Sequence, residues 1–112
     1  MITMTIGTFE SAEKALSYLG RTDDEHGRLK AHHQALDKVR KSVRAQCFLE
    51  AEGSIADRNS KAESDPRYKK AVEEWENAMA DFYTIDAKRA TATLAIEIYR
   101  SVNSSLKRGN IS

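Results

Sequence analysis

The sequence predicts an all-α fold, a long antiparallel helical hairpin with a short N-terminal helix. Residues that break helices are few, with five glycines and one proline in 112 residues. Charged residues make up 31% of the chain, a composition typical of long helices and coiled coils. Apolar residues recur three and four positions apart rather than two. The length favours a single helical domain over residues 1–112.

The short helix is expected at about residues 9–19. Thr8 precedes it and has a side chain that commonly caps a helix N-terminus. Gly20 follows it and can adopt the left-handed conformation that often ends a helix. Between them, Ala12, Ala15, Leu16 and Leu19 recur at helical spacing.

The first long helix is expected at about residues 23–63. Thr22 and Glu25 have the spacing of a capping box, in which each side chain bonds the backbone of the other. Its apolar stripe consists of Leu29, Leu36, Val39, Val43 and Cys47. At Gly53 two interpretations are open: Ser54 and Asp57 could cap a new helix, or the helix continues, since one glycine costs only about 1 kcal/mol. We expect continuity or a mild kink.

The second long helix is expected at about residues 66–108. Asp65 precedes Pro66, and proline is favoured at the first position of a helix. Its first stripe consists of Tyr68, Val72, Trp75, Met79 and Phe82, resuming at Thr93, Ile96 and Tyr99. A second apolar face consists of Ile85, Leu94, Ile98 and Val102. This extra face either packs on the short helix or forms a self-association seam, so a homo-oligomer is expected.

A short connection at Ser64–Pro66 would make the two long helices antiparallel. Residue i of the first would then lie near residue 130 − i of the second, by reflection through about residue 65. This register places Lys88 and Arg89 opposite residues 38–44.

Basic residues cluster in that zone and near the turn. The predicted nucleic-acid-binding residues are Lys38, Arg40, Lys41, Arg44, Arg58, Lys61, Lys88 and Arg89. Local density of lysine and arginine is what phosphate binding requires. Phe48, Tyr68 and Tyr83 could stack on unpaired bases. The alternative interpretation is a solvated helix face whose basic residues are partly cancelled by acidic neighbours.

Other chemistry is not indicated. The three histidines are interpreted as surface or flank residues, because only His33 has a second potential metal ligand, Asp37, at helical spacing. The only cysteine, Cys47, lies on the apolar stripe and is interpreted as a buried structural thiol. No phosphate loop, nucleophile elbow or zinc-protease motif is present. We therefore expect no enzyme activity, cofactor or metal.

The net charge of +1 excludes a global field that would draw the chain onto nucleic acid or membrane. The N-terminus lacks the pattern of a signal peptide, and no apolar run approaches the roughly 20 residues of a membrane span. The cytoplasm of a bacterial host is the expected location.

One stretch of the chain resembles known proteins. The run from Phe48 to Arg58, followed by Ala62-Glu63-Ser64 and Tyr68, is similar to small helical phage and prophage proteins. The chain also resembles phage recombination mediators of the UvsY type, in its basic helix, its Ser54…Asp57-Arg58…Lys61…Glu63 pattern and its ending Leu106-Lys107-Arg108-Gly109. Phe48-Leu49 stand where that family has two tyrosines, so no individual binding residue is carried over.

The resemblance implies an oligomeric, non-catalytic protein that binds single-stranded DNA and helps to load a recombinase. Single-stranded DNA and recombination proteins are thus the expected partners. The alternative is a protein-interaction module without nucleic-acid affinity, such as a phage-encoded inhibitor of a host defence or nuclease complex. The near-neutral charge and the two-faced last helix favour this alternative.

Overall fold

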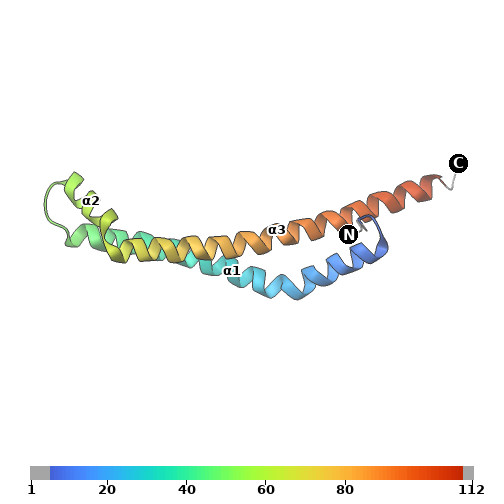
Figure 1. Cartoon of the computed structure of the whole chain (residues 1–112), viewed down its shortest axis with the longest axis horizontal. Coiled ribbons are helices and arrows are strands. Elements are labelled where there is room, and N and C mark those ends of the chain that lie inside the picture. The colour runs from blue at the N-terminus through green and yellow to red at the C-terminus, as the bar shows by residue number, and fades with distance from the viewer. Residues whose placement is uncertain (1–5, 110–112) are drawn as a thin grey trace, which may run out of the picture. The chain divides into compact units, whose positions relative to one another are not determined.

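The computed structural model describes residues 6–109 and is all-α over that range (Figure 1). Helix α1 spans Phe9–Glu50, α2 spans Ile55–Ser64 and α3 spans Pro66–Gly109. Contacts divide the chain into two compact units. Among the described residues, unit 1 combines residues 6–26 with residues 84–109, and unit 2 is Gly27–Tyr83. The predicted helix start at Pro66 is confirmed.

Helix α1 replaces two predicted elements, because the short helix and the first long helix are continuous through Gly20. The predicted capping box at Thr22 is therefore wrong. Thr22 is buried, and its hydroxyl donates to the Tyr18 carbonyl at 2.7 Å, a bond that a threonine inside a helix commonly makes. The same hydroxyl accepts a 2.8 Å hydrogen bond from Arg89 of α3. This tertiary contact outweighs a weak local signal.

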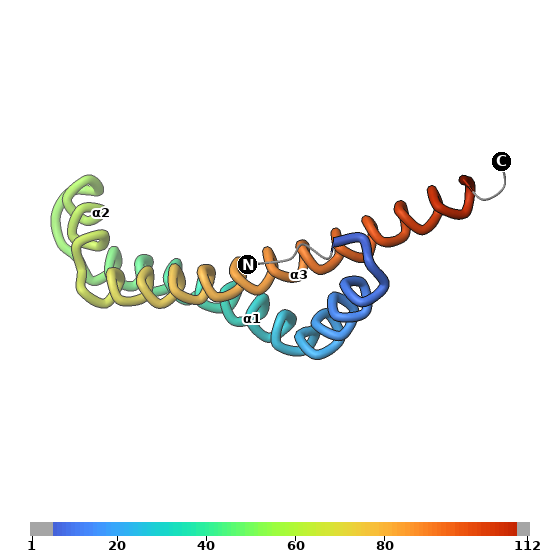
Figure 2. The backbone as a smooth tube through the Cα atoms, turned by 45° about the vertical axis from the view of Figure 1, so that its right-hand side comes forward, coloured from blue at the N-terminus to red at the C-terminus, as the bar shows by residue number. Residues whose placement is uncertain are grey.

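The expected continuity at Gly53 is also wrong. Gly53 has a φ of +116°, which belongs to the left-handed region that favours glycine. After it, the Ser54 side chain accepts from the Asp57 amide at 3.1 Å, while the Asp57 carboxylate accepts from the Ser54 amide at 3.3 Å. This capping box starts α2 as a separate helix, which Figure 2 shows as the turn of the tube at α2.

The register predicted across the hairpin is wrong by about four helical turns. Reflection placed residue 90 opposite Arg40, whereas the Arg40 guanidinium lies 3.7 Å from the centre of the Trp75 ring. The reason is α2: the connection between the long helices is residues 51–65, rather than the two or three residues at the proline. Within unit 2, α1 and α3 still run antiparallel, since residues later in α1 contact residues earlier in α3, such as Glu50 with Arg67.

The contact faces of α1 and α3 follow an alternating spacing of three and four, the repeat of a coiled coil. We call these positions the seam, and all of them are buried or half-buried. On α1 they are Ala12, Ala15, Leu19, Thr22, His26, Leu29, His33, Leu36, Arg40, Val43 and Cys47. On α3 they are Tyr68, Ala71, Trp75, Ala78, Phe82, Ile85, Arg89, Ala92, Ile96 and Tyr99.

The seam corrects several predictions about single residues. Val39 and Leu16 are 46% and 64% exposed and lie outside it, although both were predicted among the apolar positions of their helices. His26 and His33, which were interpreted as surface or flank residues, are half-buried seam residues. The His26 Nε2 atom lies 2.9 Å from an Asp86 carboxylate oxygen, and the His33 ring stacks on Phe82 at 4.8 Å. Polar residues thus share the helix interface with alanines and large apolar side chains.

None of the helices in the described part of the chain combines the length and the hydropathy needed to cross a lipid bilayer.

Candidate nucleic-acid interface

Helix α2 is held against the rest of unit 2 by three of the basic residues that the sequence assigned to phosphate binding. Arg44 reaches it from α1. Its guanidinium donates to a Glu63 carboxylate oxygen at 2.9 Å and to the Asn59 side chain at 3.1 Å. Arg44 is therefore a structural link between α1 and α2 as well as a positive charge.

Arg58 and Lys61 make the return contacts from α2. The Arg58 Nε donates to the Phe48 carbonyl at 3.2 Å, and its guanidinium lies 4.2 Å from the centre of the Phe48 ring. Lys61 donates to the Glu52 carbonyl at 2.7 Å. Both bonds go to carbonyl groups at or just beyond the end of α1, where the intrahelical pattern ends; the Phe48 carbonyl also accepts from the Ala51 amide at 3.3 Å. The ring of Phe48 is thereby partly covered and is a poor candidate for stacking on a base.

Two further predicted residues on α1 share the carboxylate of Asp37. Arg40 pairs with it at 2.6 Å and Lys41 at 3.1 Å. The hydrogen bond from Lys41, joined by that from Arg40, lowers the pKa of Asp37. Arg40 is mostly covered by Trp75, whereas the Lys41 side chain is 65% exposed. Lys38, one turn earlier, is exposed and has no ion pair among the described residues.

Lys88 and Arg89 do not take the positions that the predicted register gave them. Arg89 donates to the Leu19 carbonyl and the Thr22 hydroxyl, both at 2.8 Å, and pairs with Asp23 at 2.6 Å. These partners precede the predicted residues 38–44 on α1 by about 20 positions. The Arg89 side chain is only 17% exposed, so its charge is used within unit 1. Lys88 is exposed and also belongs to unit 1.

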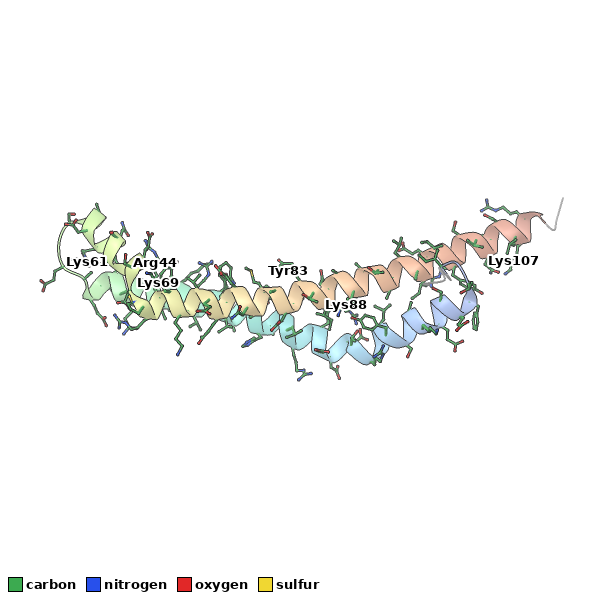
Figure 3. The ribbon with its side chains drawn as sticks, in the orientation of Figure 1. Arg44, Lys61, Lys69, Tyr83, Lys88 and Lys107 are labelled. Carbon is green, nitrogen blue, oxygen red and sulfur yellow. The ribbon has the colours of Figure 1, made fainter. Side chains whose placement is uncertain are left out.

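The remaining predicted residues lie in one part of unit 2. We call residues 38–70 the basic end: the last part of α1, all of α2 and the start of α3. It contains nine lysines and arginines against five aspartates and glutamates, an excess of four in a chain whose net charge is +1. Figure 3 shows three of these residues, Arg44, Lys61 and Lys69, on this part of the ribbon. Local clustering therefore supplies a positive field that the whole chain lacks.

Five lysines of the basic end are exposed, and they come from all three helices: Lys38, Lys41, Lys61, Lys69 and Lys70. The sequence-based site omitted Lys69 and Lys70. Both belong to the group of basic residues near the turn that is visible in the sequence, and they lie in the first turns of the helix that starts at Pro66. Exposed lysines at this density can contact several phosphates of one strand.

Arg67 contributes less free charge to the basic end. It pairs with Glu50 at 2.6 Å and with Asp65 at 3.0 Å. Its hydrogen bonds lower the pKa of Asp65 to about 2, so this carboxylate stays charged at neutral pH. The three residues together fix the start of α3 against the end of α1.

The aromatic residues predicted to stack on bases differ in accessibility. Tyr83 is 57% exposed and packs on Phe82 with ring centres 5.2 Å apart, but it lies outside the basic end. Tyr68 is half-buried on the seam, beside the exposed Lys69. Tyr68 is therefore the aromatic residue best placed within the basic end.

The buried position predicted for Cys47 is confirmed, and burial raises the pKa of its thiol. Residues 6–109 contain no group of three or more histidine, cysteine or carboxylate side chains that could hold a metal ion.

Comparison with known proteins adds no relative: no family model matches the chain, and no curated protein or solved structure is found to be similar.

Proposed function

We propose that this chain is a non-catalytic accessory protein that binds single-stranded DNA through its basic end. It would work as a homo-oligomer in the cytoplasm and assist the loading of a recombinase, as its resemblance to phage recombination mediators implies. The observation that carries the proposal is the excess of four positive charges in residues 38–70, with five exposed lysines on three helices.

The chemistry of the basic end suits a flexible strand. Exposed lysines are point charges on flexible stems, and they neutralise phosphates without reading sequence. Tyr68, half-buried within the basic end, is the aromatic ring proposed to stack on an unpaired base. Acidic residues bound the basic end on α3, where Glu73, Glu74 and Glu76 follow Lys70. This change of sign limits the strand to the end of unit 2 that carries α2.

The test measures anisotropy of a labelled oligothymidylate over a series of salt concentrations. The variant is Lys38→Glu with Lys69→Glu, because both side chains are exposed and neither has an ion pair among the described residues. The logarithm of the binding constant falls linearly with the logarithm of the salt concentration. Loss of two phosphate contacts should make this slope less steep by about 1.4.

The matched control is Lys88→Glu with Lys107→Glu, which changes the net charge equally within unit 1 (Figure 3). It should leave the salt dependence close to that of the natural chain. Absence of binding at low salt would contradict the proposal. Equal weakening by the two variants would also contradict it, because net charge rather than the basic end would then drive binding.

A protein-interaction module is the second candidate, and one observation favours it. Leu49 and Ile55, on either side of the α1–α2 connection, are 74% and 71% exposed. Large apolar side chains exposed together often mark contact sites for another protein. Stoichiometric capture of a protein partner, lost in Leu49→Ser with Ile55→Ser, together with no oligonucleotide binding, would support this candidate over the first.

A further inference from the structure

Unit 1 has an apolar hollow beside its seam. The hollow has a volume of about 310 Å³ and lies between α1 and α3. It is lined by Phe9, Glu13, Leu16, Ile96, Tyr99 and Arg100, among others. Phe9 and Leu16 are each 64% exposed, although Phe9 also makes an edge contact with Tyr99 at 5.9 Å. We call this surface the unit 1 groove.

On the α1 side of the groove, residues recur with the same three-and-four spacing as in the seam. Phe9, Glu13, Leu16 and Gly20 are separated by four, three and four residues, so they follow one stripe of the helix. Gly20 lies in the interior of α1, and a Cβ added there would meet nothing within 4 Å. Glycine is disfavoured inside helices, whereas its small size permits another helix to approach closely. The stripe therefore has the form of a helix-packing face.

The charged residues of unit 1 indicate which partner could cover this face. Residues 6–26 contain five acidic and two basic residues, whereas residues 84–109 contain two acidic and five basic residues. Unit 1 thus joins an acidic segment of α1 to a basic segment of α3. At the groove this contrast is represented by Glu13 on α1 and Arg100 on α3, both exposed and without an ion pair among the described residues.

We propose that the unit 1 groove binds the same groove of a second copy of this chain around a two-fold axis. Two-fold symmetry brings one surface against itself, so a surface that carries one acid and one base can form two equivalent ion pairs. Glu13 of each copy faces Arg100 of the other, and Phe9 and Leu16 of both copies fill the hollows. The packing is that of a four-helix bundle. This inference rests on the proposed function, which includes a homo-oligomer, and it specifies the surface through which two copies associate.

The first experiment measures mass by light scattering during size exclusion, over a range of protein concentrations. The natural chain should contain the two-fold pair, and Leu16→Glu should raise its dissociation constant by about 30-fold or more. Leu94→Glu is the matched control, because Leu94 is 52% exposed in unit 1 and does not line the groove. A natural chain that stays monomeric at about 100 μM would overturn the proposal, as would equal dissociation by both variants.

The second experiment exchanges charges and does not depend on the apolar variants folding. Glu13→Arg alone and Arg100→Glu alone should each associate at least tenfold more weakly than the natural chain. An equimolar mixture of the two variants should form a mixed pair. In that pair the two substituted side chains, one from each copy, would face each other with opposite charge, and the two unsubstituted side chains would keep their natural pairing. Failure of the mixture to associate more tightly than either variant would overturn the two-fold arrangement.

The outcomes separate this inference from the proposed function. Oligonucleotide binding by a chain that is monomeric at every concentration would overturn the groove contact and the homo-oligomer, but not DNA binding through the basic end. A groove-dependent pair that binds no oligonucleotide would overturn only the proposed function. Lys38→Glu with Lys69→Glu should leave the mass unchanged, since both residues lie in unit 2.

Discussion

Arginines in this chain serve different purposes according to their place on the helix. Arg40 and Arg89 occupy seam positions, where one covers Trp75 and the other donates to Leu19, Thr22 and Asp23. Lys38 and Lys41 stand two residues before and one residue after the seam position at Arg40, and both are exposed. A shift of one or two positions along the helix therefore decides whether a basic residue links two helices or faces solvent.

Arg89→Ala tests the structural role of this arginine. The change removes three interactions of a mostly buried group and should lower the free energy of unfolding by about 2–3 kcal/mol. Lys88→Ala, at the exposed neighbouring position, should change it by less than about 0.5 kcal/mol. Urea unfolding followed by circular dichroism measures both. Unchanged stability with weaker oligonucleotide binding would instead restore Arg89 to the nucleic-acid interface.

At the scale of the element, α2 decides how the long helices face each other. Its capping box at Ser54 and the positive φ of Gly53 separate it from α1. The connection of 15 residues that results shifts the register by about four turns from that predicted. The same element brings Arg58 and Lys61 back towards the end of α1.

Two glycine substitutions should have opposite effects on stability. Gly53→Ala should destabilise by about 1–2 kcal/mol, because alanine is strained at a φ of +116° and its Cβ would lie 3.0 Å from the Asp57 side chain. Gly27→Ala should stabilise by about 0.5–1 kcal/mol, because Gly27 lies inside α1 with open space around it. Thermal unfolding of both variants checks this pair. A stabilising Gly53→Ala would show that α1 and α2 can form one helix.

At the scale of the whole molecule, positive and negative residues are concentrated in different segments, although the net charge is only +1. The basic end carries an excess of four, while its ion pairs with acidic neighbours stabilise the fold. The three described carboxyl groups with lowered pKa values are Asp37, Glu50 and Asp65, all in unit 2. Their main partners are Lys41 for Asp37 and Arg67 for the other two.

Unit 2 should therefore lose stability in acid. A carboxyl group whose pKa is lower in the folded state stabilises fully above its ordinary pKa, and this stabilisation is lost as the pH falls. For Asp65 the loss runs from the ordinary value of 3.8 towards about 2. Fluorescence of Trp75, the only tryptophan, reports urea unfolding of unit 2 at pH 7, 4 and 2.5.

Asp65→Asn provides the comparison. The Asp65 side chain accepts from the Arg67 amide at the start of α3 at 2.9 Å, and asparagine can make the same bond but does not titrate. The urea midpoint of Asp65→Asn should fall less between pH 4 and 2.5 than that of the natural chain. Equal falls would show that the Asp65–Arg67 pair contributes nothing to the acid dependence.

The site could be predicted only in part. Residue type and density along the chain are visible in the sequence, and Lys38, Lys41 and Lys61 stay exposed in the region where they were expected. Their grouping with Lys88 and Arg89 depended on a register that no local pattern specifies. A strict three-four spacing through Thr22, His26, His33 and Arg40 was present in the sequence, but polar residues at those positions concealed it.

The sequence by itself determined that the chain is helical and that a helix begins at Pro66, because helical periodicity and proline chemistry act over a few residues. Only the tertiary structure decided that α1 runs through Gly20, that it breaks before Ser54, and which residues face each other. At Gly20 and Thr22 the local preference for ending one helix and starting another is worth about 1 kcal/mol. The hydrogen bond from Arg89 to Thr22 readily outweighs this preference. The position of one ten-residue helix then sets the register of the two long ones.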